Sequence, residues 1–120
     1  MFEVSVAGSF IAIHAVTISG VDETPHEHDW QVTAVVGNET LDDDGLVVDF
    51  LQLEASLQAV LATLAGTDLN TNDVLNGMNP STEIVAKYIA TELIKRVPSP
   101  ARVLSIMLTE APNCIATYRL

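Results

Sequence analysis

The stretch FIAIHAVTISGVDETPHEHDWQVTAVV, residues 10–36, decides the fold. Near both of its ends apolar residues recur two positions apart, which is the pattern of a β-strand with one buried face. Residues 22–25, Asp-Glu-Thr-Pro, break this pattern as a turn does. The stretch therefore predicts one strand within residues 2–18 and a second over residues 30–36, paired antiparallel.

Two helices are predicted after these strands. Asp49, followed three residues later by a glutamine, resembles an N-terminal capping box, and the apolar residues after it keep helical spacing. The first helix is therefore predicted over about residues 50–64. A second helix is predicted to open with Asn79 as its N-cap and Pro80 at its first position, and to end at Val97-Pro98-Ser99-Pro100.

Two more extended runs follow, at residues 103–108 and 115–120, separated by the turn-like Ala111-Pro112-Asn113. The predicted order is strand, strand, helix, helix, strand, strand. This order indicates a single α+β domain over residues 1–120, with a four-stranded antiparallel sheet and two helices on one face. Because an open sheet leaves two unpaired edges, we also expect the chain to form oligomers.

Composition excludes several classes of function. Five lysines and arginines against sixteen aspartates and glutamates give a formal net charge of -11, which disfavours binding to nucleic acid or to acidic membranes. Residues 1–6 lack the pattern of a secretory signal, and no apolar run approaches the roughly 20 residues that span a bilayer. We therefore expect a cytoplasmic protein. Cys114 is the only cysteine, so a metal site in one chain would depend on histidine.

The chain has three histidines, His14, His26 and His28. On a strand, His26 and His28 lie on the same face, and His14 on the neighbouring strand can complete a set of three nitrogen ligands. Zinc held by three protein ligands keeps a position open for a substrate oxygen or a water molecule. The alternative is that the His-x-His pair decorates a surface loop, which is the more common role of such a pair taken alone.

The motifs of the chain resemble those of the 6-pyruvoyl-tetrahydropterin synthase and 6-carboxytetrahydropterin synthase family. The family patterns are F-x-A-x-H, H-G-H-N-Y, G-m-v-x-D-F, L-N, N-P-T-x-E and a late glutamate. Their counterparts occur in the same order over nearly the whole chain, as Phe10–His14, His26–Trp30, Gly45–Phe50, Leu69-Asn70, Asn79–Glu83 and Thr109-Glu110.

This resemblance implies the tunnelling fold, in which subunits join their sheets into a barrel, commonly as a hexamer of two trimers with sites between subunits. It also implies that His14, His26 and His28 bind Zn2+. The late glutamate, Glu110, would anchor the pterin ring beside Thr109, since a carboxylate accepts from adjacent N-H groups. The alternative for Glu110 is a solvated charge at a strand end.

The chain departs from the family at its usual catalytic residues. Asp22 stands where short-loop members have a catalytic cysteine, and Ala65-Gly66 stand where they have an Asp-His pair. Glu23 matches an E-x-x-H-G-H variant that resembles enzymes releasing 6-hydroxymethyl-dihydropterin. Glu23 or Asp22 is therefore the candidate general base, and a solvated acidic loop is the alternative. Cys114 is expected to be buried and inert rather than a nucleophile.

The predicted function is a zinc-dependent carbon-oxygen lyase of pterin metabolism, acting on dihydroneopterin triphosphate or a related pterin. The resemblance includes the 6-carboxytetrahydropterin synthases of queuosine biosynthesis. Ala65-Gly66 favours the alternative, a noncatalytic homologue that binds zinc and a pterin. The scarcity of cationic side chains leaves a third possibility, a zinc enzyme with an uncharged substrate.

Overall fold

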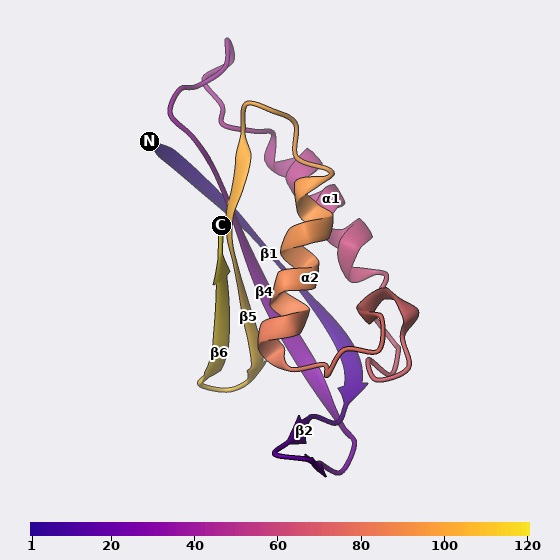
Figure 1. The fold of residues 1–120 in the computed structure, drawn as a ribbon. Coiled ribbons are helices and arrows are strands. Elements are labelled where there is room, and N and C mark those ends of the chain that lie inside the picture. The colour runs from indigo at the N-terminus through magenta and orange to yellow at the C-terminus, as the bar shows by residue number, and fades with distance from the viewer.

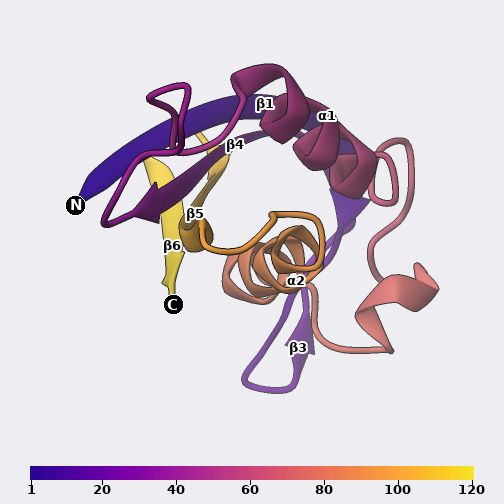
Figure 2. The same ribbon diagram turned by 90° about the horizontal axis from the view of Figure 1, so that it is seen from above.

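A four-stranded antiparallel sheet in the order β1-β4-β5-β6 forms one layer of the protein, and two helices form the other. The computed structural model describes residues 1–120. The sheet curves around helices α1 and α2, which both lie on its inner face (Figures 1 and 2). The elements are β1 Phe2–His14, β2 Thr17–Ile18, β3 Val21–Asp22, β4 His26–Asn38, α1 Phe50–Leu61, the 3-10 turn η1 Asp73–Leu75, α2 Thr82–Ile94, β5 Arg102–Ala111 and β6 Cys114–Arg119. This architecture confirms the predicted α+β sheet with two helices.

The core lies between the sheet and the helices, and the period of two along each strand selects it. Strand β4 contributes four fully or almost fully buried side chains at alternate positions, Trp30, Val32, Ala34 and Val36. The Trp30 ring stacks on Phe10 of β1 with centroids 5.7 Å apart, and its Nε1 donates to the carbonyl of Ala12 at 3.2 Å. Trp30 therefore has both its ring and its polar atom satisfied, directly beside the strand ends that carry the histidines.

The outer edge of β1 is covered near its end by the segment that follows α1. The Ile13 N-H donates to the Thr67 carbonyl at 3.0 Å, and the Leu69 N-H donates to the Ile13 carbonyl at 2.8 Å. The Gly66 N-H also donates to the carbonyl of Ile11 at 2.7 Å, with Gly66 at φ +71°, a conformation that favours glycine. The segment that contains Ala65-Gly66 thus supports the strand end instead of presenting proton-transfer groups.

The second helix begins later than the sequence predicted. Its N-cap is Ser81, whose hydroxyl accepts from the Ile84 N-H at 3.2 Å, so the prediction of Asn79 as cap and Pro80 as first helical residue was wrong. The amide of Asn79 is already bonded to both backbone groups of Thr17 and is not available to cap a helix.

Two other elements end earlier than the sequence predicted. Helix α1 is capped by Asp49 as predicted, but it ends at Leu61, and residues 62–65 form tight turns. Strand β1 ends at His14, and farther along the chain Ser19 and Gly20 take positive φ values of 52° and 78°. Two such residues in sequence favour a tight β-hairpin, here the small β2-β3 hairpin. No helix of the structure is long and apolar enough to cross a membrane.

Candidate metal centre

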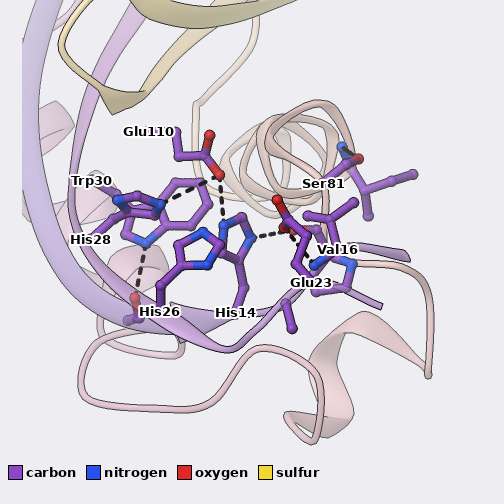
Figure 3. Close-up of polar contacts among 12 residues, drawn as sticks. His14, Val16, Glu23, His26, His28, Trp30, Ser81 and Glu110 are labelled. Carbon is purple, nitrogen blue, oxygen red and sulfur yellow. Dashed lines mark hydrogen bonds and ion pairs between the residues drawn. The ribbon is translucent and has the colours of Figure 1, made fainter. Parts of the chain in front are cut away.

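The three histidines lie together at one end of the sheet, on the same face as the core. Strand register places His14 opposite His26 and Ala12 opposite His28, so all three imidazoles follow the alternation that buries Trp30. The ring centroids are 4.5 to 5.4 Å apart. His14 is fully buried, and the other two are partly exposed. The predicted cluster of histidines is therefore formed within one chain (Figure 3).

Backbone carbonyls fix the orientation of two of the imidazoles. His14 Nδ1 lies 2.8 Å from the Pro80 carbonyl oxygen, and His26 Nδ1 lies 2.9 Å from that of Thr24. A carbonyl accepts hydrogen bonds and cannot donate them, so both Nδ1 atoms carry a proton. In the neutral ring the Nε2 atom then presents a lone pair. This arrangement is the usual support for a metal-binding histidine.

Glu110 completes the cluster from the end of β5. Its Oε1 lies 2.6 Å from His14 Nε2 and 3.7 Å from His28 Nε2, and both of these nitrogens are buried without a hydrogen-bond partner. One ligand atom from each of His14, His26, His28 and Glu110 lies within 4.8 Å of the others. Nitrogen lone pairs and a carboxylate that converge in this way repel one another unless a cation lies among them.

These donors fit a zinc ion. Zinc is bound by imidazole nitrogen and carboxylate oxygen at about 2.0–2.2 Å, commonly with four ligands. Imidazole also suits copper, iron and nickel, so the donor set favours a transition metal over magnesium or calcium. The residues would be His14, His26 and His28, the ligands that the sequence predicted, with Glu110 as a carboxylate beside them.

His28 is tuned toward its neutral form. Partial burial is the largest cause that lowers the pKa of His28 below its ordinary value, and the neighbouring His26 and His14 lower it further. The carboxylates of Glu110 and Glu23 act in the opposite direction. A neutral imidazole is the form that binds a metal, so the lowered pKa favours metal binding at neutral pH.

The lowered pKa of His28 predicts how the stability of the metal-free protein depends on pH. Unfolded His28 takes up a proton near pH 6.5, whereas the folded protein does so only at a lower pH. Between these two pH values the unfolded state binds more protons than the folded state. The contribution of His28 to the free energy of unfolding is therefore complete above pH 6.5 and is lost as the pH falls. Urea unfolding of chelator-treated protein should show this loss, and His28→Gln should reduce it. An equal pH dependence in both proteins would contradict the assignment.

The two candidate bases belong to the β2-β3 hairpin beside the cluster. The carboxylate of Glu23 accepts from the Val16 N-H at 2.9 Å, and the Glu23 N-H donates to the Val16 carbonyl at 3.0 Å. Figure 3 shows Glu23 and Val16 in the same region as the three histidines. Asp22 instead accepts from the Thr17 hydroxyl at 2.6 Å. Glu23 is thus the carboxylate of this hairpin whose charge acts on His28, and Asp22 is engaged within the hairpin.

Two asparagines, Asn70 and Asn79, hold the segment between His14 and the hairpin. The Asn70 side chain accepts from the Ala15 N-H at 2.7 Å and donates to the Ala15 carbonyl at 2.8 Å. Asn79 makes the same two bonds with Thr17, at 2.8 and 3.0 Å. Val16, the residue that holds Glu23, lies between these two fixed residues. Both asparagines therefore position Glu23.

Loss of the two hydrogen bonds between Asn79 and Thr17 should make the hairpin more mobile. Asn79→Ala removes two hydrogen bonds to Thr17 and is expected to destabilise the fold by about 1–3 kcal/mol. It should also speed amide exchange at Val16 and Glu23, while Asn79→Asp, which keeps the acceptor, should have a smaller effect. Hydrogen exchange measured by NMR tests this. Unchanged exchange in the alanine variant would show that Asn79 does not hold the hairpin.

Two cavities border Glu110. One, of about 420 Å3, lies between the start of α2 and β6 and is also lined by Thr82, Glu83 and Cys114. The other, of about 430 Å3, includes Thr109 and His28. Both have the size of small-molecule sites, about 300–1,000 Å3.

The first cavity changes the interpretation of two residues. Cys114 is exposed there, so the expectation of a buried cysteine was wrong; β6 is an edge strand and nothing covers this position. Glu83 brings a second carboxylate to this cavity and has no ion-pair partner. Its motif marked it in the sequence, but its approach to Glu110 depends on the packing of α2 against the sheet.

Comparisons with known proteins agree with this geometry. The sequence model of the family described as 6-pyruvoyl tetrahydropterin synthase matches residues 3–120. A dihydroneopterin monophosphate aldolase of Pyrococcus furiosus is 32% identical over 102 residues, which cover 85% of this chain and 83% of the relative.

Solved structures share the fold. The Caenorhabditis elegans 6-pyruvoyl tetrahydropterin synthase superposes with a TM-score of 0.86 at 20% identity, covering 99% of this chain and 95% of that chain. The Plasmodium falciparum enzyme gives 0.80 at 23% identity, with 99% and 97% covered. A Plasmodium vivax enzyme with a catalytic glutamate replaced by alanine gives 0.78 at 21% identity, again with 99% and 97% covered.

Proposed function

The chain belongs to the 6-pyruvoyl tetrahydropterin synthase family, and on that premise we propose that it is a zinc-dependent lyase that cleaves the side chain of a dihydroneopterin phosphate. The observation that carries the proposal is the convergence of three imidazoles and the Glu110 carboxylate on one point. When bound there, zinc would polarise the hydroxyl and carbonyl oxygens of the substrate side chain.

The hairpin glutamate favours cleavage of a carbon-carbon bond. The chain lacks the usual cysteine and Asp-His pair but keeps Glu23 beside the cluster, and its 32% identical relative is named an aldolase. In the proposed reaction Glu23 takes the proton of the hydroxyl on the second side-chain carbon. The bond between the first and second carbons breaks, the second becomes an aldehyde, and the first regains a proton. The products are 6-hydroxymethyl-dihydropterin and glycolaldehyde carrying the phosphate.

The charge of the chain favours a substrate with few phosphates. Five cationic side chains face sixteen acidic ones, and phosphate recognition requires cations. The name of the aldolase relative specifies a monophosphate. Binding a monophosphate requires fewer cationic side chains than binding the predicted triphosphate. We therefore propose a dihydroneopterin monophosphate as the preferred substrate, with the triphosphate as the weaker one.

The pterin ring would lie in the cavity that Glu110 and Glu83 share. The edge of the ring offers adjacent N-H donors, which a carboxylate accepts well. Glu110 is the predicted anchor, but its Oε1 faces His14 and His28, whereas Glu83 has no ion-pair partner. Fluorescence titration with 6-methylpterin measures the affinity of Glu110→Gln and Glu83→Gln for the pterin ring. The variant that loses more affinity identifies the carboxylate that anchors the ring.

Assembly of several subunits is part of the proposal. Strands β1 and β6 are the two edges of the sheet, and exposed apolar side chains lie on them, among them Phe2 and Ile115. Pairing of these edges between copies would close a barrel, with two trimers forming the hexamer that the family implies. Light scattering should then give six times the 12.9 kDa chain mass, or three times for a single ring. A monomer at micromolar concentration would contradict this.

A single experiment tests the function. Metal content is measured on the purified protein, and dihydroneopterin mono- and triphosphate are supplied separately while products are followed by mass spectrometry. The expected result is about one zinc per chain and release of 6-hydroxymethyl-dihydropterin. Zinc and tight pterin binding without turnover would instead support the noncatalytic homologue, which the Ala65-Gly66 departure favours. Absence of both zinc and product would overturn the proposal.

A further inference from the structure

We infer that Glu110 is the fourth ligand of the metal in the substrate-free protein and leaves it when a pterin ring binds. The inference rests on the proposed function, since it presumes zinc at the histidines and a pterin in the adjoining cavity. It adds that the Glu110 carboxylate binds the metal in the absence of substrate and the pterin ring in its presence. Binding of the substrate would then free the ligand position that its own side chain occupies.

The distances support a ligand role for Glu110. Ligand bonds of 2.0–2.1 Å in a tetrahedral zinc site place neighbouring ligand atoms about 3.3 Å apart. Glu110 Oε1 lies 2.6 Å from His14 Nε2 and 3.7 Å from His28 Nε2, values on either side of this separation. The carboxylate therefore reaches the point at which the imidazole nitrogens converge.

No lysine or arginine lies close enough to neutralise the Glu110 carboxylate. Its side chain is 24% exposed, forms no hydrogen bond to a protein donor, and has no lysine or arginine within ion-pair distance. His14 Nδ1 already carries its proton toward Pro80, so the neutral ring turns a lone pair, not an N-H, toward the carboxylate. A metal ion explains this arrangement, because it turns the repulsion between the lone pair and the carboxylate into two attractive bonds.

The position of Glu110 between the metal site and the cavity explains why it should leave. Zinc sites with four protein ligands are usually structural, whereas catalytic sites keep one position open. Glu110 also lines the cavity of about 420 Å3, where the N-H donors of a pterin ring compete for its oxygens. Moving the carboxylate to the ring would open the fourth position as the substrate arrives.

Zinc affinity tests the first half of the inference. Competition with a chromophoric chelator is measured for the wild type, Glu110→Gln and Glu83→Gln, with folding checked by circular dichroism. Glu110→Gln is expected to weaken zinc binding at least about tenfold. Glu83→Gln is the matched control, because Glu83 lines the same cavity without contacting a histidine, and it should bind zinc as the wild type does. Equal affinity in all three proteins would overturn the inference.

Cobalt substitution tests the second half. The visible spectrum of bound Co2+ depends on the number and the kind of its ligands, so replacing the Glu110 carboxylate by water should change the spectrum. Saturating 6-methylpterin, a ring without side-chain hydroxyls, should make the wild-type spectrum approach that of Glu110→Gln. A wild-type spectrum that does not change when 6-methylpterin is added would overturn the proposed departure of Glu110. One zinc per chain together with turnover would leave the proposed function intact in either case.

Discussion

Replacing His14 by alanine is expected to abolish stoichiometric zinc binding, with a loss of affinity of more than about 100-fold. Changes to groups that merely support a ligand already cost 10- to 100-fold, and His14 supplies a ligand atom directly. His14 is also the fully buried member of the cluster, at the centre of its contacts with His26, His28 and Glu110. Its removal should therefore affect the geometry of the whole set.

The measurement is zinc content after dialysis, together with the thermal midpoint with and without zinc. Zinc at 100 times its dissociation constant should stabilise the wild type by about 2.7 kcal/mol, and His14→Ala should lose this gain. Glu27→Ala is the matched control, since Glu27 lies between His26 and His28 but is exposed, on the opposite face of β4. Zinc retained by His14→Ala, or lost by Glu27→Ala, would contradict the proposed centre.

The histidine cluster was predictable because a strand has a strict period of two. His26 and His28 must share a face, and pairing of the first two strands brings His14 opposite His26. The same alternation predicted a strand with one buried face over residues 30–36, and Trp30, Val32, Ala34 and Val36 form that face. The fold and the grouping of the three histidines were therefore accessible from local patterns, which depend on few contacts distant in sequence.

Contacts between distant segments were not accessible in this way. The Pro80 carbonyl that orients His14 lies 66 residues away in the chain, and Asn70 and Asn79 bind residues 55 and 62 positions earlier. Asn79 was mistaken for a helix cap because local sequence favours that role, whereas tertiary packing assigned its amide to Thr17. The approach of Glu110 to His14 likewise depends on sheet order.

Glu23→Gln is expected to lower turnover by about 10²- to 10⁴-fold while zinc remains bound, if Glu23 is the general base. Glutamine keeps an oxygen that can accept from the Val16 N-H, so the hairpin should keep its position beside the cluster. It loses the capacity to take a proton from the substrate hydroxyl. The expected loss therefore lies in kcat, with zinc content and 6-methylpterin affinity close to those of the wild type.

Asp22→Asn is the matched control for this prediction, because it makes the same chemical change one residue away. Asparagine can still accept from the Thr17 hydroxyl, and Asp22 is bonded within the hairpin instead of facing the histidines. Its turnover should stay within a few-fold of the wild type. If Asp22→Asn loses turnover and Glu23→Gln keeps it, the base is Asp22. If both variants keep their turnover, the two hairpin carboxylates are only solvated charges of the loop. The proton must then leave through a group outside the β2-β3 hairpin.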